Sequence, residues 1–208
     1  MMIRKLSIEQ IRELLIATPE QAVFDWKVDF VLPSTAEAQG ELIKDVTGIA
    51  NALTSAPGYI FYGVDPRQPE PIRGVSNTYD DSRLQQLFEN KVRPAVEFVY
   101  YEVASTGNII SVIHISPTRK RPHIITVNLG KMKDGQIPIR RGSSTDGVTI
   151  EDLFQMFYGP FSGYFESVIQ KKQLQLQQQQ IEQEDLRMLD KHADELQRQM
   201  RRSLGLPD

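Results

Sequence analysis

The stretch EQAVFDWKVDF, residues 20–30, is the first place in the chain where side chains capable of chemistry gather. Apolar residues alternate there with Asp25, Lys27 and Asp29, and Glu20 stands just before them. This alternation predicts a strand over residues 22–30 with one buried face and one polar face. A solvated face would explain the charges. Carboxylates also bind divalent cations, so an acidic metal site is the alternative interpretation.

Basic residues concentrate in a second region, residues 117–141, which carries a net charge of +6 in a chain whose total is −3. Such a zone on an otherwise acidic protein indicates a polyanionic partner, with a solvated loop as the alternative. The segment IRRGSST, residues 139–145, joins two arginines to a glycine and three hydroxyl side chains, all suited to phosphate oxygens. The predicted nucleic-acid contacts are Arg119, Lys120, Arg121, Arg140, Arg141, Ser143, Ser144 and Thr145.

Several other chemistries lack the residues they need. The sequence has no cysteine, which excludes thiolate metal sites and cysteine nucleophiles and favours a reducing compartment. No P-loop motif occurs, so ATP is not expected as a cofactor, and the three histidines are not spaced for a zinc pair. The N-terminal segment lacks the apolar region of a signal peptide, and no long apolar run follows. We therefore expect a cytoplasmic protein with no membrane partner.

The elements that must position these residues follow from capping signals and periodicity. Helix starts are predicted at Ser7, Ser34, Thr78 and Thr149. A buried strand is predicted over residues 59–64, EFVYYEV and IISVIHI are predicted to form a hairpin, and HIITV and QIPIR are further short strands. Helices mixed with such strands indicate an α+β domain over residues 1–158, with a mixed, mostly antiparallel sheet and packed helices.

The composition changes after residue 158. Gly159 and Pro160 are predicted to end the preceding helix, and residues 159–208 form a helical, glutamine-rich extension. The spacing of a coiled-coil seam is kept by Leu186, Leu189, Ala193, Leu196 and Met200. A long helix that is polar around most of its circumference gains stability when its narrow apolar seam meets another helix. We therefore expect a coiled-coil homodimer; a lone amphipathic helix packed on its own domain is the alternative.

Short motifs also follow one another in a characteristic order. They are Glu20 with F-D-W-K at 24–27, I-A-N-A-L at 49–53, P-G-Y-I-F-Y-G-V-D at 57–65, Gly74, K-V-R-P at 91–94, S-P-T-R-K-R-P at 116–122 and I-R-R-G-S-S-T at 139–145. Together they resemble the Schlafen AlbA-like domain family, also labelled divergent AAA, over residues 7–158. The resemblance implies an α+β fold, nucleic-acid binding and, in the Schlafen proteins themselves, endonuclease action on structured RNA such as tRNA.

The resemblance also implies a catalytic site. The three carboxylates that act in Schlafen nucleases fall here on Glu20, Asp25 and Asp65, with Lys27 on the same strand face as Asp25, and they would hold Mg²⁺ or Mn²⁺. Two features depart from the family pattern: Asp25 replaces a glutamate, and Pro57 replaces the first of two glycines. Aspartate is one methylene shorter, which matters to an octahedral shell at about 2.1 Å. Either departure is compatible with binding without cutting.

The resulting expectations belong to different classes of function. The leading one is a nucleic-acid-binding protein that acts as a metal-dependent endoribonuclease, with RNA favoured over DNA as the partner. Pairing of two chains would then supply the second lobe that Schlafen nucleases place around their substrate. The alternative is a non-catalytic DNA-binding transcriptional regulator or adaptor. A more distant one is a structural assembly protein whose basic loop only steers association.

Overall fold

The computed structural model describes residues 5–17, 23–118 and 120–203, apart from some side chains of the last helix. The chain divides into two compact units, Met1–Tyr158 and Gly159–Asp208. In chain order the elements are α1 (Ile8–Ala17), β1 (Phe24–Lys27), α2 (Ala36–Ala50), β2 (Gly58–Tyr62), α3 (Asp81–Phe88), β3 (Val92–Arg93), β4 (Phe98–Ser105), β5 (Asn108–Ile115), β6 (Ile124–Ile125), β7 (Pro138–Arg141), β8 (Ser144–Gly147) and α4 (Ile150–Ser203).

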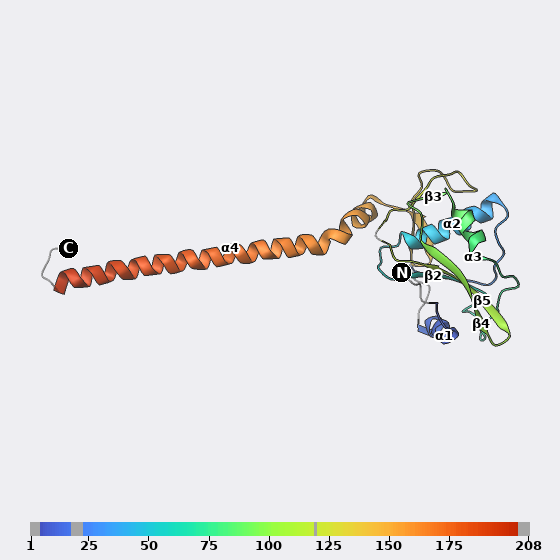
Figure 1. Cartoon of the computed structure of the whole chain (residues 1–208), viewed down its shortest axis with the longest axis horizontal. Helices are drawn as coiled ribbons and strands as arrows, with labels where there is room; N and C mark the ends of the chain where they lie inside the picture. Colours follow the sequence, from blue (N-terminus) through green and yellow to red (C-terminus); the bar gives the residue numbers. More distant parts are fainter. Residues whose placement is uncertain (1–4, 18–22, 119, 204–208) are drawn as a thin grey trace. The chain divides into compact units, whose positions relative to one another are not determined.

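Four strands form the central sheet of the first unit, in the order β1-β2-β5-β4. β1 and β2 are parallel, which requires a crossover that α2 provides, and the other neighbours are antiparallel. α1 covers one face of the sheet, and α2 and α3 cover the other (Figure 1). The predicted α+β fold with a mixed, mostly antiparallel sheet is therefore confirmed.

The polar face predicted for the first strand is covered. β1 has only four residues, and Asp25 on its polar side is 6 % exposed because α2 and β7 pack there. Trp26 points the other way, into the cluster under α1. Beyond Lys27 the alternation ends, and Phe30 packs on Tyr62 in the α2 cluster instead of beside Trp26. The alternation of apolar and polar residues along a strand does not show whether its polar side faces water or is covered by a helix.

Capping signals predicted some helix starts closely. Ser7 and Gln10 at the start of α1 form the predicted capping box, with hydrogen bonds of 2.9 and 3.3 Å. The N-caps of α2 and α3 are Thr35 and Asp80, one and two residues later than predicted. Neighbouring hydroxyl and carboxylate residues can all cap a helix, so sequence leaves an uncertainty of this size.

α4 runs through Gly159 and Pro160, so the helix end predicted there is wrong. A proline removes one backbone hydrogen bond, and a long helix keeps the bonds on either side of it. In the predicted seam the described side chains are exposed, namely Leu186, Leu189, Leu196 and Met200. The side chain of Ala193 lies outside the described residues. A coiled coil requires a second chain and stays a prediction. No helix in the described part of the chain is long and apolar enough to cross a bilayer.

Candidate nucleic-acid interface

The two basic segments predicted to bind nucleic acid meet at the C-terminal end of α2. We call residues 116–123 the basic loop and residues 138–147 the β7–β8 hairpin. The amide nitrogen of Asn51, the C-cap of α2, donates to the carbonyls of His123 and Pro138 at 2.9 and 2.8 Å. Its amide oxygen accepts from the backbone nitrogen of His123 at 2.8 Å. Asn51 is fully buried, so one side chain clamps the basic loop to the hairpin.

The hairpin presents its turn to solvent. β7 and β8 pair antiparallel, with Arg141 opposite Ser144, and Gly142 and Ser143 form the two-residue turn. Gly142 has φ +59°, the left-handed conformation that such turns require. Ser143 and Ser144 are exposed. The sequence predicted a connecting turn here and missed β8, because Ser-Thr-Asp-Gly shows no apolar alternation.

Two of the predicted cations face solvent. The Lys120 side chain is 65 % exposed and pairs with Glu97 at 2.7 Å. Arg141 is 38 % exposed and pairs with Asp152 in the first turn of α4. The exposed Lys120–Glu97 pair contributes little to stability, so a phosphate can replace Glu97 at small cost. The side chain of Asp152 is only 12 % exposed, so its pair with Arg141 is held more firmly. Arg119 lies outside the described residues.

Two other predicted contacts are turned inward. Arg121 donates to the carbonyls of Ala52 and Thr54, just beyond α2, where the helix dipole favours a cation. Partial burial lowers the pKa of Arg121. The Arg140 side chain is 3 % exposed and donates to the carbonyls of Phe24 and Gly142 at 3.3 and 3.1 Å. These arginines hold the backbone of the surface in place.

Arg140 also belongs to a charge cluster with Asp25, Lys27 and Asp45, in which Asp25 and Arg140 are buried and Lys27 and Asp45 are partly exposed. Arg140 Nη2 lies 3.2 Å from Asp25 Oδ1, and Lys27 Nζ lies 3.0 Å from Asp25 Oδ2 and 2.8 Å from Asp45 Oδ2. Asp25 Oδ2 has no hydrogen bond of good geometry, so its contact with Lys27 is an ion pair. Burial opposes the charge on Lys27, but the two carboxylates outweigh it and raise the pKa of Lys27. Two acids thus balance two bases.

The described part of the predicted metal site consists of Asp25 and Asp65, and both carboxylates already face cations. Both oxygens of Asp25 face cations of the cluster, and both oxygens of Asp65 accept from Arg67, whose Nε lies 2.9 Å away. Side-chain hydrogen bonds from Arg67 lower the pKa of Asp65. Within the described residues no group of three or more acidic or histidine side chains could hold a metal. Glu20 lies outside the described residues, so the trio of carboxylates stays a prediction.

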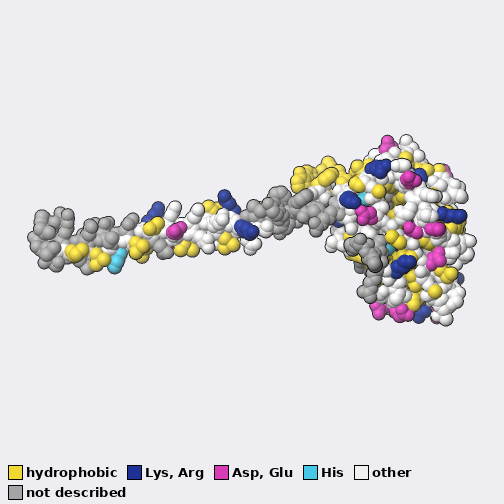
Figure 2. Space-filling view, in the orientation of Figure 1, with side chains coloured by type: hydrophobic (Ala, Val, Ile, Leu, Met, Phe, Trp, Pro, Cys, Tyr) yellow, Lys and Arg dark blue, Asp and Glu magenta, His cyan; other side chains and the backbone are white. Residues whose placement is uncertain are grey.

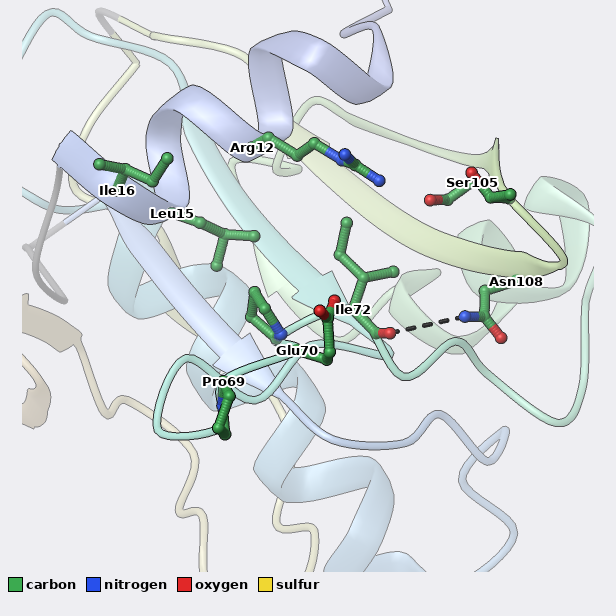
Figure 3. Close-up of a pocket in the computed structure, with 10 residues that line it drawn as sticks. Arg12, Leu15, Ile16, Pro69, Glu70, Ile72, Ser105 and Asn108 are labelled. Carbon is green, nitrogen blue, oxygen red and sulfur yellow. Dashed lines mark hydrogen bonds between the residues drawn. The ribbon is translucent and has the colours of Figure 1, made fainter.

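A separate pocket of about 420 Å³ lies on the α1 side of the sheet (Figure 3). Arg12 and Leu15 come from α1, and Glu70 and Ile72 come from the loop that follows Asp65. Asn108 is the first residue of β5, and its amide nitrogen donates to the carbonyl of Ile72 at 3.5 Å. Its walls mix charged and apolar groups, as in many small-molecule sites. None of the predicted site residues lines it.

Comparison with known proteins identifies one family. The family model described as Schlafen, AlbA_2 matches residues 20–149, which is more than half of the chain and contains the basic loop and the hairpin. No curated protein matches. Among solved structures, the chain is similar to the solution NMR structure of the N-terminal domain of a Nitrosomonas europaea protein named for its relation to the ATP-dependent DNA helicase RecG. The sequence identity is 17 % and the TM-score is 0.43, over 70 % of this chain and 95 % of that one.

Proposed function

Because the chain belongs to the Schlafen, AlbA_2 family, as its motif order predicted, we propose that it binds nucleic acid, with RNA favoured over DNA. The observation that supports this best is the Asn51 clamp, which joins the basic loop to the β7–β8 hairpin. The exposed cations, hydroxyls and turn of the two segments then form one surface instead of two isolated charges. Phosphate oxygens are the ligands that such a mixture of donors suits.

The exposure of each described side chain decides whether we propose it as a direct phosphate contact or as a support for the surface. Lys120, Arg141, Ser143 and Ser144 face solvent and are proposed to contact phosphate, and Arg119 is proposed as a further contact from its place in the sequence. In contrast, Arg121, Arg140 and the half-buried Thr145 are proposed to support the surface from inside. The list of direct contacts is therefore shorter than the sequence indicates.

Lys120→Ala tests the surface with little risk to folding, because the side chain is largely exposed. Fluorescence anisotropy with labelled single-stranded RNA, duplex RNA and DNA should show weaker binding to all three ligands. The slope of log K against log salt should shrink by roughly 0.7 to 0.9 for the lost contact. Arg83→Ala is the matched control, since Arg83 is an exposed cation on α3. An unchanged affinity and slope for Lys120→Ala would reject this surface.

Binding without cleavage is the form of this function that the charge cluster supports best. The same protein should bind tRNA, ribosomal RNA or DNA and leave them intact, with or without Mg²⁺ or Mn²⁺, as a regulator or adaptor would. The competing prediction is a metal-dependent endoribonuclease acting through Glu20, Asp25, Asp65 and Lys27. Metal-dependent cleavage that Asp65→Ala abolishes, while binding survives, would establish the enzyme instead.

We further propose that two chains pair through α4. Thirteen of the eighteen exposed large hydrophobic side chains among the described residues lie on this helix. A helix that leaves so much apolar surface in water is stabilised when another helix covers it. Size-exclusion chromatography with light scattering should give twice the mass of the chain. A mass of one chain at every concentration would reject the pairing, without bearing on the nucleic-acid surface.

A further inference from the structure

The first nine residues of α4, Ile150–Tyr158, lie within the first unit and have two unlike faces. Asp152 and Met156 point inward and are 9 % and 4 % exposed. The outward side carries four large apolar residues, each more than half exposed: Ile150, Phe154, Phe157 and Tyr158. At about 100° per residue these four fall within an arc of about 100°, so they form one continuous stripe. We call this stripe the aromatic face.

The aromatic face is large for a surface left in water. An aromatic side chain offers about 150 to 250 Å² of contact area, so four residues exposed to this extent present roughly 400 Å² of apolar surface. This matches the largest apolar patch of a typical soluble monomer, about 300 to 600 Å², which is often functional. The rings of Phe154 and Tyr158 already stack, with centroids 5.8 Å apart and planes 23° apart. The face is thus preorganised before any partner arrives.

We propose that the aromatic face packs against the same face of a second copy of this chain. The inference rests on the proposed pairing through α4 and extends it into the unit that carries the nucleic-acid surface. Continuity supports it, because exposed hydrophobic side chains, yellow in Figure 2, recur among the described residues of the same helix from Ile169 to Met200. A two-fold axis would bring identical stripes together, as in most homodimers.

The area argues that the face does not act alone. Two copies of the stripe would bury roughly 800 Å², below the roughly 1,200 Å² at which stable interfaces begin. The apolar residues farther along α4 must supply the remainder, which makes the aromatic face one part of a long interface. A nucleic acid is the less suitable occupant, since Glu151 places an exposed carboxylate in the same first turn.

The inference links pairing to nucleic-acid binding. Asp152, on the inner side of the same turn, is the partner of Arg141 in the β7–β8 hairpin. It also caps α4, accepting from the backbone nitrogen of Thr149 at 2.7 Å. The turn that presents the aromatic face is therefore fixed to the surface proposed to contact phosphate. A pair of chains would present two such surfaces to one ligand, which increases avidity when both can be engaged.

The absence of cysteine from the sequence permits a direct test in the full chain. Tyr158→Cys, placed on the face, should give a disulfide-linked dimer under mild oxidation. Gln155→Cys, an exposed residue of the same turn outside the face, should remain largely unlinked. In parallel, Phe154→Gln with Tyr158→Gln should weaken pairing by about thirtyfold in light scattering, since buried aromatic anchors dominate interfaces. The circular dichroism spectrum of this double variant should match that of the parent chain, because both replaced side chains are exposed.

The outcomes distinguish the proposal for the aromatic face from the proposal that two chains pair through α4. If Leu189→Gln weakens the dimer while Phe154→Gln with Tyr158→Gln does not, pairing through α4 stands and the aromatic face is rejected. Equal cross-linking of Tyr158→Cys and Gln155→Cys rejects the face as well. A parent chain that is monomeric at every concentration rejects both proposals together, and Lys120→Ala still decides the nucleic-acid surface.

Discussion

Replacing Arg140 with methionine should destabilise the first unit strongly. The substitution keeps much of the side-chain volume but removes hydrogen bonds to Asp25, Phe24 and Gly142. Asp25 is then a buried carboxylate with Lys27 as its only cation of the cluster. Breaking one partner of a buried ion pair costs about 3 to 5 kcal/mol, and the remaining contact with Lys27 places this case near 3 kcal/mol. That is a large part of the 5 to 15 kcal/mol typical of a whole domain.

Urea unfolding followed by tryptophan fluorescence measures this loss. Trp26 is the one tryptophan of the sequence, next to Asp25 on β1 and stacked on Phe61 with centroids 4.6 Å apart, so its emission reports on this part of the sheet. With a slope of about 2 kcal/mol per molar urea, the midpoint should fall by about 1.5 M. Arg83→Met, an exposed arginine on α3, should change stability by less than about 0.5 kcal/mol.

A second substitution separates the ion pair from packing. Adding Asp25→Asn to Arg140→Met removes the unpaired charge, and the double variant should recover at least about 1 kcal/mol. If the double variant is no more stable than Arg140→Met alone, lost packing explains the effect. If Arg140→Met itself stays within about 1 kcal/mol of the parent, Asp25 is not held by Arg140, and the assignment of Asp25 to a structural ion pair is rejected.

The remaining predictions concern other single positions. Asn51→Ala should lower the unfolding free energy by about 2 to 3 kcal/mol and weaken RNA binding, because three backbone groups of the basic loop and β7 lose their partner; unchanged binding in anisotropy would contradict the clamp. Gly63→Ala should lower the unfolding free energy measured in urea by at least about 2 kcal/mol, because φ is +85° and a Cβ would lie 2.7 Å from the backbone of Gly74. Gly107→Ala is the control: this residue also has a positive φ but faces open space, so the substitution should cost about 1 kcal/mol. Burial lowers the pKa of His114 below 6.5, so the unfolded chain binds the proton first. The contribution of neutral His114 to the free energy of unfolding is therefore complete above pH 6.5 and is lost as the pH falls below that value. His114→Gln should flatten this part of a plot of unfolding free energy against pH. An unchanged plot would refute this role.

Local signals predicted much of the fold but little of the site. The capping box at Ser7 and the β4–β5 hairpin depend on neighbours in sequence, and both form as expected. The partner that buries Asp25 is 115 residues away along the chain, and no periodicity connects it to β1. The clamp at Asn51 spans 72 residues to the basic loop and 87 to β7. A helix-ending asparagine looks like an ordinary cap in sequence, so its role in joining two segments could not be predicted.

The basic region shows how charge counting misleads. The sequence does not distinguish a buried arginine that supports a surface from an exposed cation that can contact a ligand. Only the burial of the side chain in the structure does so. Of the predicted cations, Arg121 and Arg140 are bonded to backbone carbonyls, which leaves Lys120, Arg141 and the undescribed Arg119 for phosphate. Three contacts imply a salt slope of about −2 to −3, whereas all five predicted cations would give about −3.5 to −4.5. A measured slope near the larger value would mean that the arginines turn outward on binding, and the charge cluster would then have to open when nucleic acid binds.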